Sequence, residues 1–201
     1  MKISIIAGCW LLVVLAGSLL MAQYSITAGI TGTPPEQWPE TSHAQRAPGL
    51  AQLVMFLHPR CPCSRATLGE LEQLMAHCQG KFGAQVWFIQ PEGMDEDWAK
   101  TDLWHAATAI PGVQVNVDLH GEEAGRFQAA TSGLTLLYDA GGLLVFHGGI
   151  TLARGHSGDN PGRDAIESLL KQKSSHVTSS PVFGCALAGE KLQTECTACQ
   201  P

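Results

Sequence analysis

The chain has 201 residues, 45% of them hydrophobic and 15% charged, with a formal net charge of −6. This length provides one globular domain with a single core, and an acidic chain without a basic patch excludes nucleic acid as the partner. Seven cysteines are many for a chain of this size in a reducing cytosol, so the compartment decides how they are interpreted.

Residues 1–22 are predicted to be a membrane anchor. The run from Ile3 to Ala22 carries no charged residue, and its length of about 20 residues is what a helix needs to cross a bilayer. Lys2 precedes this run and the next basic residue is Arg46, so the positive-inside rule places the rest of the chain outside the cytoplasm. We therefore expect a single-pass protein of the inner (cytoplasmic) membrane with a periplasmic domain. A cleaved signal peptide is the alternative, although Leu20-Met21-Ala22 is a poor cleavage site.

The remaining chain divides into a tether, a domain and a tail. Residues 23–47 are rich in Gly, Pro, Thr and Ser and predict an extended tether, and the polar residues 174–201 form a tail with three cysteines. Within the domain, residues 48–173, apolar periodicity predicts strands at 50–57, 84–90 and 113–119, a hairpin at 134–149, and helices at 63–79, 95–108, 121–130 and 162–173. This alternation predicts an α/β sheet that is covered on both faces.

The stretch "FLHPRCPCSRATLGEL", residues 56–71, is the candidate site. Cys61 stands where an apolar strand turns into an amphipathic helix, and a helix start offers unpaired N–H groups that stabilise a thiolate. Arg60 and Arg65 add positive charge, as does His58 when protonated. Cys61 is therefore the candidate nucleophile, whereas Cys78 continues the apolar face of the helix and is expected in the core.

This turn, in this order of elements, resembles the thioredoxin-like superfamily, and its membrane-tethered periplasmic members most of all. Their motif reads Phe-Trp-x-x-Trp-Cys-x-x-Cys-x-x-x-x-Pro-x-Leu, and Phe56, Cys61 and Leu71 match it. Ser64 takes the place of the second cysteine, and Gly133 falls at the family's cis-proline. The resemblance covers about residues 48–173 and is closest to a membrane-anchored subgroup called RedB.

The resemblance implies a fold and an activity. The expected fold is a three-layer α/β/α sandwich with a mixed central sheet, preceded by an N-terminal transmembrane helix. The expected activity is thiol-disulfide exchange with the thiols and disulfides of other extracytoplasmic proteins, without a cofactor. In the family the cis-proline keeps metal off the thiols and helps to dock the partner chain, so Gly133 opens that wall of the site.

With Ser64 in place of the second cysteine, another residue must resolve a mixed disulfide on Cys61. Cys63 is favoured, because a residue two positions away has a far higher effective concentration than a loose tail. Residues two apart at a helix start have Cα atoms about 5.5 Å apart, within disulfide range, although the ring is strained. The tail is the alternative: Cys185, or one of Cys196 and Cys199 in "CTAC", would then have to reach Cys61.

A different class of function remains open at the same residues. Two thiolates in a Cys-Pro-Cys turn together with an imidazole are ligands for a soft ion such as Cu(I). Cys61, Cys63 and His58 are the candidate ligands, and His156 in the loop "GGITLARGHSGDNPG" is a further supplier. This alternative is a copper-type binding protein without enzymatic activity.

Overall fold

The computed structural model describes residues 2–95, 97–173 and 175–187. Its helices are α1 (Lys2–Ile26), α2 (Ser64–His77), α3 (Asp102–Ala109), α4 (Glu122–Arg126) and α5 (Pro161–Leu170). Its strands are β1 (Ala51–Leu57), β2 (Phe82–Gln90), β3 (Val113–Leu119), β4 (Leu134–Tyr138) and β5 (Leu144–Gly148). The order of strands and helices is the one predicted from the sequence.

The strands form one mixed sheet of five in the order β3-β2-β1-β4-β5. β1 runs parallel to β2, and β2 parallel to β3, whereas β4 is antiparallel to both β1 and β5. The predicted hairpin is therefore confirmed. Because β1 lies in the centre of the sheet, the turn that follows Leu57 emerges from the middle of the molecule rather than from an edge.

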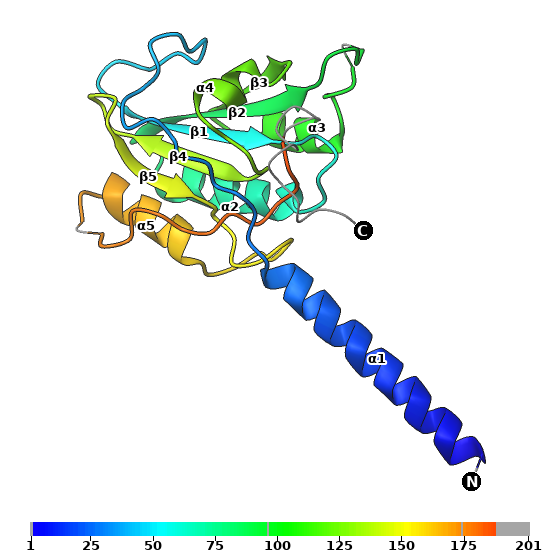
Figure 1. The fold of residues 1–201 in the computed structure, drawn as a ribbon. Coiled ribbons are helices and arrows are strands. Elements are labelled where there is room, and N and C mark those ends of the chain that lie inside the picture. Colours follow the sequence, from blue (N-terminus) through cyan, green and yellow to red (C-terminus); the bar gives the residue numbers. More distant parts are fainter. Residues whose placement is uncertain (1, 96, 174, 188–201) are drawn as a thin grey trace.

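Alternate residues of β1 supply two apolar clusters, one on each face of the sheet. Leu53 and Met55 pack on one face with residues from α2, α3 and α5. Val54 and Phe56 face the other side, where they pack with Phe127 and with residues of α4 and the tail. Figure 1 shows α2 and α5 on one side of the sheet and α4 on the other. The expected three-layer sandwich is confirmed, with α4 and non-helical segments forming its thinner layer.

The helix predicted for residues 95–108 begins later than expected, at Asp102. Asp95 does not cap a helix: its side chain accepts the N–H of Asp97 and its carbonyl accepts that of Trp98, which closes a separate turn. The Thr101 hydroxyl donates to the Pro59 carbonyl and ties the start of α3 to the cysteine turn. Apolar spacing across this turn suggested one helix where the chain makes a turn and then a helix.

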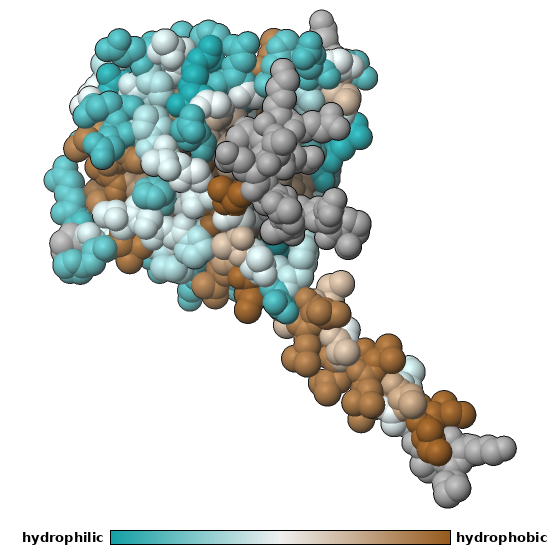
Figure 2. Space-filling model, in the orientation of Figure 1, coloured by the Kyte–Doolittle hydropathy of each residue, from teal (hydrophilic) through white to brown (hydrophobic). Residues whose placement is uncertain are grey.

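α1 projects from the domain as a single rod, and its visible face is apolar along its length (Figures 1 and 2). Its segment Ile5–Ile26 has 22 residues, a mean hydropathy of 2.4 and no residue buried against the domain. Among its described residues, only the last turn of the helix is seen to contact the domain, where the Arg154 guanidinium lies over the Tyr24 ring and the Arg154 N–H donates to the Ser25 carbonyl. An apolar helix that is exposed over most of its length is typical of a membrane span or a signal sequence. The structure is thus consistent with the predicted N-terminal transmembrane helix.

The tether was predicted for residues 23–47, but residues 23–26 are the end of α1. Residues 27–47 lie outside the named helices and strands and contact the domain. Gln37 forms a bridge with Leu143, and the Tyr138 hydroxyl donates to the Pro35 carbonyl over 2.9 Å. The Trp38 ring packs edge-on against Tyr138, with centroids 5.2 Å apart. This segment therefore covers part of the sheet face that carries few helical residues.

Candidate functional site

The cysteine turn joins the central strand to α2. The Cys61 N–H donates to the His58 carbonyl and the Ser64 N–H donates to the Cys61 carbonyl, each over 3.1 Å. Cys63 is the N-cap residue of α2 in a helical backbone conformation, and its carbonyl accepts the N–H of Ala66. Cys61 therefore lies in the last turn before α2, and the N–H groups of Ser64, Arg65 and Ala66 at the helix start are already paired with carbonyls of this turn.

Cys61 is buried, with 1% of its surface exposed, and its sulfur is surrounded by hydrogen-bond donors. The N–H of Cys185 in the tail lies 3.4 Å from the Cys61 Sγ. The hydrogen bond from the Cys185 side chain has the largest effect on the Cys61 pKa and lowers it to about 4; the Cys185 backbone, Ser64 and Cys63 act in the same direction, against the effect of burial. The arrangement stabilises a thiolate at neutral pH.

Cys63 and Cys185 behave in the opposite way. Burial raises the pKa of the Cys63 thiol, and the negative charge of Cys61 raises it further, while Arg154 opposes both. The pKa of Cys185 is raised chiefly because its thiol hydrogen-bonds to Cys61, and again Arg154 acts against the rise. One thiolate is therefore held between two protonated thiols, beside one arginine.

Ser64, which replaces the expected second cysteine, hydrogen-bonds to Cys61 through its side chain and also belongs to a hydroxyl network. Its Oγ lies 2.9 Å from the Oγ of Ser132, and the His58 N–H donates to the same Ser132 Oγ over 2.8 Å. Gly133, next along the chain, donates its N–H to the Phe56 carbonyl and has a φ of +96°. A Cβ at Gly133 would lie 3.3 Å from the Thr67 Oγ1. This segment thus joins β1, α2 and β4 directly behind the cysteine turn.

The positive side chains next to Cys61 face outward. The Arg60 guanidinium lies over the Trp98 ring, 5.1 Å from its centroid, and Arg65 forms an ion pair with Asp102. Burial lowers the pKa of His58, so at neutral pH this ring is uncharged. Sequence analysis gave His58 as a source of positive charge only when it is protonated. The hydrogen bonds from Cys185, Ser64 and Cys63 lower the Cys61 pKa without that charge.

Arg154 is a site residue that sequence analysis did not single out. It lies in the loop between β5 and α5, residues 149–160, and buried contacts of this loop hold it in position. Glu70 of α2 is fully buried, forms an ion pair with Arg163 of α5, and accepts the Gly158 N–H over 2.7 Å. At the other end of the loop, the Arg154 guanidinium donates to the Gly184 carbonyl over 2.5 Å. The loop thus connects the helical layer to the tail.

The alternative metal site is not assembled in the part of the chain that the structure describes. No group of three or more His, Cys, Asp or Glu side chains is arranged there to hold a metal ion. His156 is exposed, and its N–H donates to the Ala153 carbonyl in a turn of the loop. Cys196 and Cys199 lie outside the described residues.

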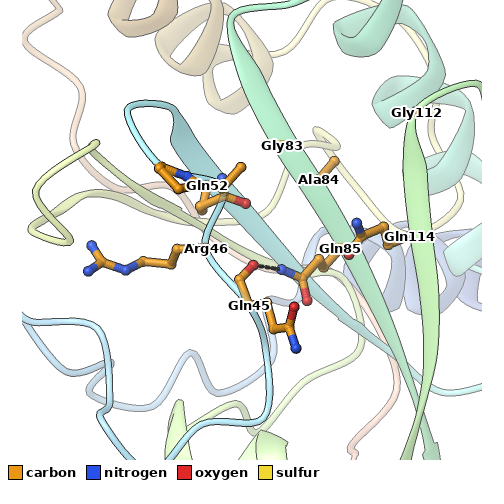
Figure 3. Close-up of a pocket in the computed structure, with 10 residues that line it drawn as sticks. Gln45, Arg46, Gln52, Gly83, Ala84, Gln85, Gly112 and Gln114 are labelled. Atoms are coloured by element: carbon orange, nitrogen blue, oxygen red, sulfur yellow. Dashed lines mark hydrogen bonds between the residues drawn. The ribbon is translucent and has the colours of Figure 1, made fainter.

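A surface hollow of about 230 Å³ borders Cys61, and Pro59, Arg60, Pro62 and Leu103 are among its lining residues. It provides a way for a partner sulfur to approach a thiol that is otherwise covered. A second hollow, of about 280 Å³, lies at the opposite end of the sheet, where β1 and β2 begin. Figure 3 shows its glutamine side chains, with Gln85 donating to the Gln45 carbonyl; it contains no cysteine.

No protein-family model and no curated protein matches the chain. Among solved structures, an uncharacterized conserved protein from Geobacillus kaustophilus has a TM-score of 0.60 at 17% identity, over 83% of this chain and 94% of its own. A hypothetical protein from Sinorhizobium meliloti 1021 has a TM-score of 0.59 at 22% identity, over 81% and 94%. A secreted disulfide oxidoreductase from Mycobacterium tuberculosis has a TM-score of 0.46 at 14% identity, over 62% and 83%.

The fold is thioredoxin-like. At these identities the likeness concerns the fold alone, so the activity has to be argued from the site. The cysteine turn lies between the central strand and the first helix of the sheet, where the resemblance predicted it. What the sequence did not reveal is that the tail returns to this turn and brings Cys185 to Cys61.

Proposed function

We propose that this protein is a membrane-tethered, extracytoplasmic thiol-disulfide oxidoreductase with Cys61 as its nucleophile. The observation that carries the proposal is the buried Cys61 sulfur, which accepts hydrogen bonds that lower its pKa and borders an open hollow. A thiolate at neutral pH is the reactive form in disulfide exchange. The apolar α1, with Lys2 before it and the domain after it, supports the extracytoplasmic location, and the resemblance of residues 48–173 supports the RedB subgroup.

The reaction begins with attack of the Cys61 thiolate on a disulfide of a partner protein. A bond forms between Cys61 and one partner sulfur, the partner disulfide breaks, and its other sulfur leaves as a thiolate that takes a proton from solvent. A second cysteine of this chain then attacks Cys61 and releases the partner as a dithiol. Two electrons have passed from the chain to the partner, and the same steps reversed oxidise a partner dithiol.

Residues around the hollow have separate roles in this proposal. Arg60, held over Trp98, and the neutral His58 present the surface on which the partner chain lies against Cys61. Gly133 keeps the wall behind the cysteine turn open, because any side chain there would press on Thr67. These contacts position the partner, whereas the charge on Cys61 comes from its own hydrogen bonds.

The test uses the full-length protein in detergent with insulin as the disulfide substrate and a dithiol as the electron source. We expect the wild type to accelerate insulin reduction and Cys61→Ser to lose the acceleration entirely. Cys9→Ser is the matched control, because Cys9 lies on the exposed surface of α1 far from the turn, and it should retain full activity. Equal rates for the wild type and Cys61→Ser, or a stoichiometric bound copper ion with all thiols reduced, would contradict the proposal.

A further inference from the structure

The tail, which sequence composition marks as a loose extension, is docked on the domain up to the last described residue. After α5 it pairs with the end of β5, where the His147 N–H donates to the Thr178 carbonyl and the Ser180 N–H donates to the His147 carbonyl. The orange-to-red segment in Figure 1 then crosses the molecule towards the start of α2. Val182 joins the apolar cluster on the α4 face of the sheet and is 1% exposed.

The last stretch of this segment pairs with the residues that precede β4. The Ser132 N–H donates to the Cys185 carbonyl and the Leu187 N–H to the Ala130 carbonyl, each over 2.8 Å, and Thr131 forms an antiparallel bridge with Ala186. Gly184 is in such close contact that a Cβ there would lie 1.9 Å from the Ser132 carbonyl oxygen. The pairing therefore fixes the register that presents Cys185 to Cys61.

Cys63 is close in sequence, but its backbone is committed to α2. As N-cap residue it has φ −66° and ψ −28°, and its carbonyl accepts the N–H of Ala66. A bridge to Cys61 would close a small ring across Pro62, whose φ is fixed, and would strain or unwind the helix start. Cys185 lies in an extended segment with an isolated bridge, which can shift at less cost.

We infer that Cys185 is the resolving cysteine, which forms the catalytic disulfide with Cys61 across the docked tail. This inference rests on the proposed function and names the second thiol of that reaction. After Cys61 has formed a mixed disulfide with a partner, the Cys185 sulfur attacks the Cys61 sulfur. The Cys61–Cys185 bond forms, the bond to the partner breaks, and the partner sulfur leaves with the proton that Cys185 gives up. A dithiol of another protein returns the pair to its reduced state.

The charges at the site order these two steps. While Cys61 is a thiolate, its negative charge and its hydrogen bond keep the proton on Cys185. When Cys61 enters a mixed disulfide, that charge disappears, and the neighbouring Arg154 then favours the thiolate of Cys185. The resolving thiol is therefore inactive before the partner is bound and becomes activated by the first step.

The experiment traps the intermediate in the full-length protein, with oxidised glutathione as the probe and intact mass as the readout. We expect Cys185→Ser to accumulate a glutathione adduct on Cys61 at least tenfold above the wild type, and Cys63→Ser to resolve the adduct as the wild type does. Cys185→Ala should give the same accumulation as Cys185→Ser. Because alanine introduces no hydroxyl group, this variant shows that the result comes from loss of the thiol.

The outcomes separate this inference from the proposed function. Accumulation in Cys63→Ser but not in Cys185→Ser would overturn the inference and leave Cys61 as the nucleophile. A Cys61 cross-link to Cys196 or Cys199 would overturn it in the same way. If no variant forms an adduct on Cys61 and Cys61→Ser resembles the wild type, the proposed function itself fails. A cooperative thermal unfolding transition with an unchanged midpoint in each variant shows that the comparison is made between folded proteins.

Discussion

The Cys185 N–H lies 3.4 Å from the Cys61 sulfur, although 124 positions separate the two residues in the chain. This contact gives the site two properties at once. It supplies hydrogen bonds that stabilise the Cys61 thiolate, and it places a second thiol within reach of the first. A standard Cys-x-x-Cys turn obtains both from neighbouring residues, whereas here the tail provides them.

The lowered pKa of Cys61 predicts its alkylation profile. A group with a depressed pKa in the folded protein remains a thiolate as the pH falls, until the pH reaches that pKa of about 4. At pH 6 an ordinary cysteine with a pKa of about 8.5 is less than about 1% thiolate, whereas Cys61 in the folded protein is almost fully ionised. Its rate of alkylation by iodoacetamide should therefore be nearly independent of pH between about 5 and 9, whereas the rate of the same residue in the unfolded protein should rise steeply with pH. Mass spectrometry of peptides labelled between pH 5 and 9 measures the rate at each cysteine.

Cys78 is the internal control for that measurement. It is fully buried in the core, and burial raises the pKa of its thiol. Cys78 should therefore remain unlabelled until denaturant unfolds the protein. Equal rates at Cys61 and Cys78, or a Cys61 rate that rises only above pH 8, would contradict a stabilised thiolate.

Gly184→Ala tests the docking of the tail without changing a cysteine. The new methyl group would meet the Ser132 carbonyl at 1.9 Å, and overpacking of this kind costs about 1–3 kcal/mol. The docked state should lose population by roughly 5- to 150-fold, so the Cys61 adduct should persist and the Cys61 pKa should rise towards its ordinary value. Rapid-quench sampling with intact-mass analysis measures the rate of adduct resolution, and the pH dependence of Cys61 alkylation measures the pKa.

Gly69→Ala is the matched control for that substitution. Gly69 lies in α2, where a Cβ meets nothing within 4 Å, so this change should leave resolution and the Cys61 pKa unaltered. Similar slowing in both variants would show that the effect is a general loss of stability rather than displacement of the tail.

Arg154→Gln should slow the second step of the reaction and spare the first. Arg154 lowers the pKa of Cys185, and loss of one pKa unit of stabilisation corresponds to about a tenfold smaller thiolate fraction. Resolution of the adduct should slow by about that factor, and its pH profile should move to higher pH, while the initial alkylation rate of Cys61 stays within about twofold. Arg60→Gln, whose guanidinium lies over Trp98, should not shift the resolution profile.

The apolar α1 predicts a membrane-bound protein. With 22 residues in its candidate span and none of them buried, the helix gains stability only in a bilayer. The full-length protein should stay in the membrane fraction after washing with high salt or carbonate, and its domain should be accessible to protease from the non-cytoplasmic side only. Recovery of a soluble form that begins near Gln23 would show that the segment is a cleaved signal peptide.

Sequence analysis predicted the parts of this molecule that depend on local patterns. Apolar runs identified the strands, because β1 buries side chains on both faces, and a helical stripe identified α2. The same stripe placed Cys78 in the core, where it is found. The start of α3 was misplaced because Asp95 closes a turn of its own ahead of the helix.

The environment of the site depends on contacts between distant segments, which local patterns do not report. The tail has few large apolar residues, yet Val182 and Leu187 pack into the apolar cluster on the α4 face of the sheet. Gly184 permits a close approach between the tail backbone and the Ser132 carbonyl. Sequence separation favoured Cys63 as partner of Cys61, because a loose tail has a low effective concentration. A docked tail removes that argument, and only the packing shows that it is docked.

Disulfide mapping of the wild-type protein tests the central claim most directly. The full-length protein is oxidised with a small excess of oxidised glutathione, unpaired thiols are blocked at low pH, and the cross-linked peptides are identified by mass spectrometry. The account predicts a disulfide between Cys61 and Cys185, with Cys63 and Cys78 recovered as blocked thiols. A Cys61–Cys63 disulfide with Cys185 blocked, or Cys61 recovered reduced, would contradict it.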